Sequence, residues 1–172
     1  SSAGRFDLFK QRLGIGECVE RTWESPFNYW EQGCFYLPQM PPPANNTAVH
    51  THNVIEKVWP LINAAGGRTF VLCTSLAAVR AAADELQARL EANGNPYPLF
   101  VQGDGPKMRL IEEFRAHGNA VLVGSMSFWE GVDVKGEALS LVVIDKIPFA
   151  PPNDPVMMAR SRAVEASGRR PF

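Results

Sequence analysis

The sequence predicts a doubly wound α/β domain, in which helices cover both faces of a parallel sheet. Its strand-like stretches are short and almost wholly apolar, as in "TFVL" and "AVLVG", which is typical of parallel strands that are buried on both faces. These stretches alternate with helical stretches, the pattern that builds βαβ units. The composition agrees with one globular domain, since 45% of the 172 residues are apolar and 20% are charged.

The chain divides into a lead-in segment, residues 1–47, and a regular part, residues 48–172. In the lead-in segment an amphipathic helix is expected over residues 6–15, followed by strands over residues 18–25 and 33–40. The proline-rich stretch "MPPPANNT" then connects the two parts, because proline does not fit a central strand.

The regular part begins with a helix over residues 49–65, which Pro60 kinks or shortens and Gly66 ends. Ser75 is expected to cap the helix after the first strand, and Asn153 or Asp154 the last helix. The predicted strands cover residues 68–75, 97–103, 119–124 and 138–149, and the other helices cover residues 76–94, 106–118 and 153–167.

Composition and cysteine usage exclude several classes of protein. The net charge of −1 gives no general attraction to nucleic acid or anionic lipid, so any such contact must be local. No apolar run reaches the roughly 18 residues of a membrane span, and a secretory signal is absent, so a cytoplasmic location is expected. We expect Cys18, Cys34 and Cys73 to be buried reduced thiols, and His50 and His52 to be solvated rather than metal-bound.

The sequence also lacks the motifs of several common enzymes, namely the GxxxxGK[ST] phosphate loop, GxGxxG, GxSxG and HExxH. Open α/β sheets bind ligands at the carboxyl ends of their strands. Hydroxyls, an amide and carboxylates follow the predicted strands there, and such groups suit a phosphodiester. For any one of them alone, a helix cap is the simpler interpretation. The residues at this rim are Thr74, Ser75, Gln102, Gly103, residues 125–133 and residues 145–149.

The stretch "VLVGSMSFWEGVDVKGEALSLVVIDKIPFAPPNDP" closely resembles the second motor domain of DinG-type DNA helicases, bacterial relatives of the XPD group in the second helicase superfamily. Upstream, "GRTFVLCTSLAAV" is similar to motif IV of this family, and "RLIEEFRAHGNAVLVG" is similar to the lead-in to its motif V. "SPFNY" and "YLP" also fit, so the resemblance covers nearly the whole chain. It implies a RecA-like domain without its own phosphate loop.

The resemblance implies roles for the loop that follows "NAVLVG". Ser125 and Ser127 match positions that contact the nucleic-acid backbone. Gly131 and Asp133 match positions that face the ATP cleft between two motor domains, and Glu130 is expected to couple the two groups. The other candidates are Thr74, Ser75, Gln102 and Lys146 for nucleic acid, and Phe128 and Trp129 for loop packing or base stacking.

The resemblance further implies that the parent protein is an ATP-dependent DNA helicase. Its first motor domain would carry the Walker lysine, the Mg²⁺-binding acidic box and a 4Fe-4S cluster, and an arginine-finger motif would follow "GRRPF". The 172-residue chain alone is therefore expected to be an inactive fragment. The implied partners are single-stranded and forked or partly duplex DNA, the first motor domain, and replication or repair proteins, with 5′ to 3′ movement.

Two other classes stay open from the residues alone. One is a non-catalytic module that binds nucleic acid or docks a partner. The other is a metabolic α/β enzyme that binds a nucleotide at the same rim; the missing phosphate loop and the lack of a rim histidine argue against it.

Overall fold

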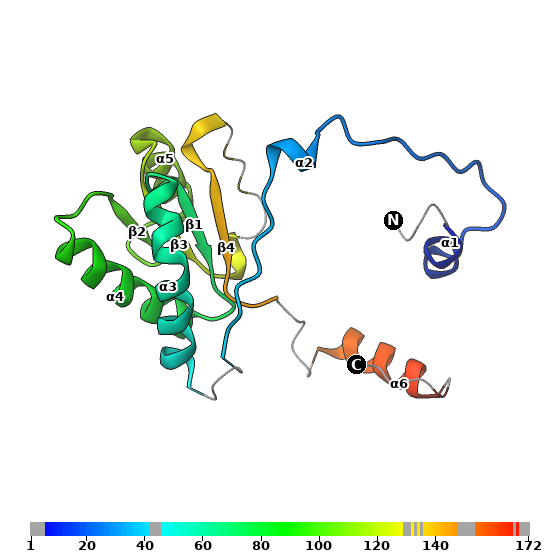
Figure 1. Cartoon of the computed structure of the whole chain (residues 1–172). Coiled ribbons are helices and arrows are strands. Elements are labelled where there is room, and N and C mark those ends of the chain that lie inside the picture. Colours follow the sequence, from blue (N-terminus) through cyan, green and yellow to red (C-terminus); the bar gives the residue numbers. More distant parts are fainter. Residues whose placement is uncertain are drawn as a thin grey trace. The chain divides into compact units, whose positions relative to one another are not determined.

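The computed structural model describes residues 6–41, 46–128, 132, 134, 136–147, 154–166 and 168. Contacts divide the chain into two compact units, Ser1–Pro38 and Gln39–Phe172 (Figure 1). The sequence predicted this division after residue 47. The second unit includes Met40 because that side chain packs against its core.

In its described residues the first unit contains two short helices and no strand. Helix α1 (Asp7–Leu13) ends where Gly14 adopts a left-handed conformation with φ of 65°, which confirms the expected helix. Helix α2 (Tyr29–Gln32) is a single turn. The strands expected over residues 18–25 and 33–40 are wrong. A strand needs a partner with which to exchange backbone hydrogen bonds, and the described residues of this unit provide no neighbouring strand; Phe35, for example, is 87% exposed.

The second unit is built on a four-stranded sheet in which every pair of neighbouring strands is parallel. The strand order is β2-β3-β1-β4, so the chain crosses over between strands as a doubly wound fold requires. All four strands and the predicted fold class are confirmed. The strands are β1 (Thr69–Leu72), β2 (Leu99–Val101), β3 (Val121–Gly124) and β4 (Leu141–Ile144).

Helices cover both faces of this sheet (Figure 1). Helices α3 (Thr47–Ala64) and α4 (Leu76–Ala92) pack on one face, where α3 presents Ile55 and Ile62, both fully buried. Helix α5 (Lys107–His117) packs on the other face through its buried side chains. That second cluster contains Phe70, Leu72, Leu110, Ile111, Phe114, Ala120, Leu122 and Phe128. Apolar stripes on the helices thus account for both layers of the fold.

Local signals set most of the helix ends. The Ser75 hydroxyl oxygen accepts a hydrogen bond from the Ala78 N–H at 3.2 Å, so Ser75 caps α4 as predicted. Asp154 caps α6 (Pro155–Ala166) by accepting from the Met157 N–H at 2.8 Å. Pro60 lies inside α3 and does not end it. None of the helices in the described residues is both long and apolar enough to cross a membrane.

Candidate functional site

The carboxyl ends of the strands form one aligned rim. Leu72, the last residue of β1, pairs with Gly124 of β3 and with Ile144 of β4. The ladder continues for one more residue, because the Cys73 N–H donates to the Gly124 carbonyl at 2.8 Å and the Asp145 N–H donates to the Leu72 carbonyl at 3.0 Å. The segments that follow β1, β3 and β4 therefore start side by side, as the sequence predicted for the rim.

The loop after β3 is bound to the end of β2 by one side chain. Gln102 Oε1 accepts a hydrogen bond from the Ser125 N–H at 2.6 Å. Gln102 was predicted to contact nucleic acid, and the structure shows that its side-chain oxygen holds this loop. Ser125 itself is buried, at 8% exposure.

A short 3₁₀ helix, η1 (Met126–Phe128), forms the next part of this loop. Lys107, at the start of α5, donates to the Ser127 carbonyl, and its Nζ lies 5.5 Å from the centre of the Phe128 ring. The Phe128 ring is 3% exposed within the cluster under α5, whereas Ser127 and Met126 are exposed. The loop thus turns its aromatic residue into the core and its hydroxyl residue outward.

The other predicted rim residues lie on neighbouring segments. Thr74 is half-buried and Ser75 is exposed, both between β1 and α4. Lys146 follows Asp145 and is also half-buried. Three segments, those after β1, β3 and β4, therefore bring hydroxyl and cationic side chains to this edge, along with the N-terminal end of α4, whose first N–H groups favour anions.

A buried pair beneath the rim was missed by sequence reasoning. His50 Nε2 of α3 lies 2.6 Å from Asp145 Oδ1, and the two side chains are 11% and 3% exposed. The expectation that His50 is solvated is wrong, while His52 is indeed exposed and lies 2.9 Å from Glu85. Helical spacing could have revealed this, because His50 shares the buried face of α3 with Val54 and Val58.

The three cysteines differ in burial, although all three were expected to be buried. Cys73 is buried, and burial, with a smaller contribution from the charge of Asp145, raises the pKa of its thiol to about 12. Cys18 and Cys34 are free and exposed, so the expectation that all three are buried is wrong. Both exposed cysteines lie in the first unit, which has no packed core over those residues.

The nucleotide side of the predicted site lies outside the described residues. This applies to Glu130, Gly131 and Asp133, and also to Trp129. Among the residues that the structure does describe, no three His, Cys, Asp or Glu side chains gather in a way that could hold a metal ion.

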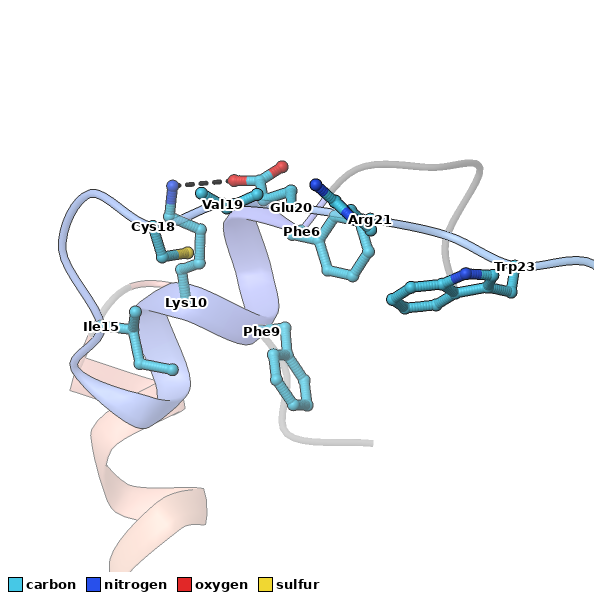
Figure 2. A pocket seen from close by; sticks show the side chains of 9 residues that line it. All are labelled: Phe6, Phe9, Lys10, Ile15, Cys18, Val19, Glu20, Arg21 and Trp23. Atoms are coloured by element: carbon cyan, nitrogen blue, oxygen red, sulfur yellow. Dashed lines mark hydrogen bonds and ion pairs between the residues drawn. The ribbon is translucent and has the colours of Figure 1, made fainter.

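A separate hollow of about 290 Å³ lies in the first unit, between α1 and the segment that follows it (Figure 2). Its floor is largely apolar, and Lys10 Nζ pairs with Glu20 Oε1 at 2.8 Å along one side. The other polar groups that line the hollow include the free thiol of Cys18 and the guanidinium of Arg21. Its lining residues are Phe6, Phe9, Lys10, Ile15, Cys18, Val19, Glu20, Arg21 and Trp23.

Comparison with known proteins places residues 58–172 in the family described as helicase C-terminal domain. The ATP-dependent DNA helicase YoaA of Haemophilus influenzae is 41% identical over 98% of the chain and 26% of the relative. The ATP-dependent helicase DinG of Mycobacterium tuberculosis is 40% identical over 98% of the chain and 25% of the relative. The 3′-5′ exonuclease DinG of Bacillus subtilis is 30% identical over 98% of the chain and 19% of the relative.

The chain thus spans about a quarter of the length of the helicases that it matches. The family model covers the whole regular part of the fold from the second half of α3 onward, including all four strands and the rim. The chain therefore belongs to the helicase C-terminal domain family, as its resemblance to DinG-type helicases predicted.

Proposed function

We propose that this chain is the second motor domain of an ATP-dependent DNA helicase, and that its rim binds the backbone of single-stranded DNA. Thr74, Ser75, Ser127 and Lys146 are the proposed DNA contacts, with Ser125 and Gln102 shaping the loop between them. Glu130, Gly131 and Asp133 face the nucleotide in a cleft shared with the first motor domain. The parent, a cytoplasmic bacterial enzyme of replication or repair, uses ATP and Mg²⁺ and carries a 4Fe-4S cluster in its first domain.

The fixed loop after β3 is the observation that carries this proposal. Gln102 binds the start of the loop through the Ser125 N–H, and Lys107 binds it two residues later through the Ser127 carbonyl. The Ser127 hydroxyl is thereby presented at the rim on a backbone that is already ordered. Preordered contacts lose less conformational entropy when a ligand binds.

The charge of the domain fits a motor better than a storage site for DNA. The net charge is −1, so binding depends on a few hydrogen bonds and one or two cations rather than on a broad basic surface. A translocating domain must release the strand once in each ATP cycle. We propose that closure of the two motor domains on ATP changes this domain's affinity for the strand, and that this difference produces 5′ to 3′ steps and unwinds forked or partly duplex DNA.

The proposal is tested in the full-length parent with matched charge substitutions. Lys146→Gln should raise the oligonucleotide concentration for half-maximal ATPase stimulation about 5-fold, the equivalent of one hydrogen bond of roughly 1 kcal/mol. It should also reduce the salt dependence of binding by about 0.7 in log–log slope, since one phosphate contact to a single strand is lost. Lys57→Gln, an exposed lysine midway along α3, is the control and should change neither quantity.

The nucleotide side needs a separate variant. Asp133→Asn should lower the DNA-stimulated ATPase rate by about 10-fold or more while binding of oligonucleotide is retained, because a charge-assisted contact in the cleft would contribute roughly 1.5–3 kcal/mol. Equal effects of Lys146→Gln and Lys57→Gln on DNA would contradict the proposed rim. Equal loss of DNA binding and ATPase in folded Asp133→Asn would contradict the division of the loop.

A further inference from the structure

A buried histidine–carboxylate pair joins α3 to the end of β4. His50 and Asp145 are 95 residues apart in sequence, and His50 Nε2 lies 2.6 Å from Asp145 Oδ1. We propose that His50 is a positioning residue: it holds the Asp145 carboxylate under the rim and so sets where the next residue, Lys146, meets DNA. This inference rests on the proposed function of the rim.

The buried Asp145 carboxylate needs a hydrogen-bond partner. A carboxylate with 3% side-chain exposure has lost almost all contact with water, and an unpaired buried charge is strongly unfavourable. Its second oxygen, Oδ2, has no hydrogen-bond partner in the part of the chain that the structure describes. An ionised carboxylate can only accept, so a charged Asp145 requires the hydrogen on His50 Nε2, which then donates to Oδ1. His50 therefore provides the compensation that keeps this carboxylate inward.

The location of β4 explains why the strand end depends on a side chain. In the described sheet β4 pairs with β1 on one side only, whereas β1 and β3 each have two neighbours. The Asp145 N–H still donates to the Leu72 carbonyl at 3.0 Å, but two residues later Ile147 is 73% exposed. Lys146 thus lies between Asp145, whose side chain is held by His50, and the exposed Ile147. Without His50, the Asp145 side chain next to Lys146 would no longer be held in place.

The same geometry separates a positioning role from a catalytic one. A His–Asp pair also occurs in nucleophilic active sites, where the histidine must reach the substrate. The His50 side chain is 11% exposed and lies on the buried face of α3, beneath the rim. It is therefore placed to act on Asp145 rather than on a ligand.

The pair is tested first by thermal and urea unfolding of the 172-residue chain. His50→Leu should raise the unfolding equilibrium constant on the order of 100-fold, because it leaves a buried charge without its partner. Adding Asp145→Asn to His50→Leu should lower the unfolding equilibrium constant again, on the order of 10-fold, because the unpaired buried charge is removed. His50→Gln keeps an N–H donor at similar reach and should stay within about 10-fold of the wild type. A double variant that is less stable than His50→Leu alone would overturn the pair.

The positioning role is tested in the full-length parent by a double-mutant cycle with Lys146→Gln. His50→Leu should raise the half-saturating oligonucleotide concentration about 3- to 10-fold, more than it lowers the maximal ATPase rate per folded molecule, and His50→Gln should restore it. In the Lys146→Gln background the His50→Leu effect on DNA should disappear. If the two effects multiply instead, His50 does not act through Lys146.

The outcomes also distinguish this inference from the proposed function. An effect of Lys146→Gln on DNA without any effect of His50→Leu overturns the positioning role and leaves the rim intact. If DNA does not stimulate the ATPase rate of the wild type or of any variant, the proposed function is overturned, and the positioning role with it.

Discussion

Gly124, the last residue of β3, lies directly against the Phe128 ring. A Cβ at Gly124 would lie 2.8 Å from Phe128 Cγ, 2.9 Å from Cδ2 and 3.0 Å from its Cβ. These are carbon–carbon approaches well inside van der Waals contact, and they involve the root of the ring rather than a flexible tip. Gly124→Ala must therefore move either β3 or the η1 segment.

The η1 segment is the part that should give way. The Gly124 backbone is fixed, because it pairs with Leu72 and its carbonyl accepts from the Cys73 N–H at 2.8 Å. Phe128 lies on a short 3₁₀ segment that pairs with none of the described strands and is held by the Lys107 contact to Ser127, by the Phe128 N–H bond to the Ser125 carbonyl and by core contacts. Displacing it would also shift Ser127, the outward hydroxyl of the proposed DNA contact.

The expected magnitude follows from overpacking. Forcing a methyl group into a filled core costs about 1–3 kcal/mol, and the lower chain entropy of alanine offsets roughly 0.4–1 kcal/mol of that. We expect a net loss of about 1–2 kcal/mol, which in a domain of this size lowers Tm by roughly 2–8 °C. Circular dichroism of the 172-residue chain measures it. Gly16→Ala is the matched control, because nothing lies within 4 Å of a Cβ there.

A second substitution shows whether the clash is the cause. Phe128→Leu alone should destabilise the domain, because it removes part of a ring that is 3% exposed. Combined with Gly124→Ala it should cost less than the sum of the two, by on the order of 0.5–2 kcal/mol, since the smaller side chain makes room for the methyl group. Strictly additive effects, or a Gly124→Ala variant as stable as the wild type, would refute this account of the loop.

The remaining predictions concern the cap, the thiols and the isolated chain. Ser75→Ala should lower the free energy of unfolding by about 1 kcal/mol, measured by urea denaturation, because α4 loses its N-cap. At pH 8 a thiol reagent should label Cys18 and Cys34 quickly and Cys73 only on unfolding, because the Cys73 thiol stays protonated below its pKa of about 12; equal labelling rates would contradict this. The purified 172-residue chain should show no DNA-stimulated phosphate release, since it contains no phosphate loop.

The regular part of the fold could be predicted from sequence because its signals are local and repeated. Apolar stretches such as "AVLVG" mark strands wherever both faces of a sheet are covered. Capping residues such as Ser75 mark where helices begin, and glycines such as Gly118 mark where they end. The alternation in residues 18–25 and 33–40 is equally strand-like. It failed because a strand also needs a neighbour along its edge, and no local pattern reports whether that neighbour is present.

The candidate site, too, could be predicted from the sequence only in part. The rim was predictable, since topology alone brings the ends of parallel strands to one edge. The roles of Gln102 and His50 were not, because each depends on a contact with a residue far along the chain, at Ser125 and at Asp145. In both cases a polar residue that looks available for a ligand is used to satisfy a group inside the protein, which buried polar groups generally require.

These internal contacts bear on how such a domain could act in a motor. Gln102, Lys107 and His50 fix the rim from three different elements: the end of β2, the start of α5, and α3. A rim with its backbone and carboxylate already paired has little freedom to remodel when a ligand arrives, because each rearrangement would first break one of these hydrogen bonds. In the proposed motor, a change of affinity for DNA would therefore come from moving the whole domain rather than from reshaping the loop, and rigid-body rotation about a cleft is a common form of such transitions. In the proposed motor these internal hydrogen bonds would therefore serve to keep the domain rigid as it moves.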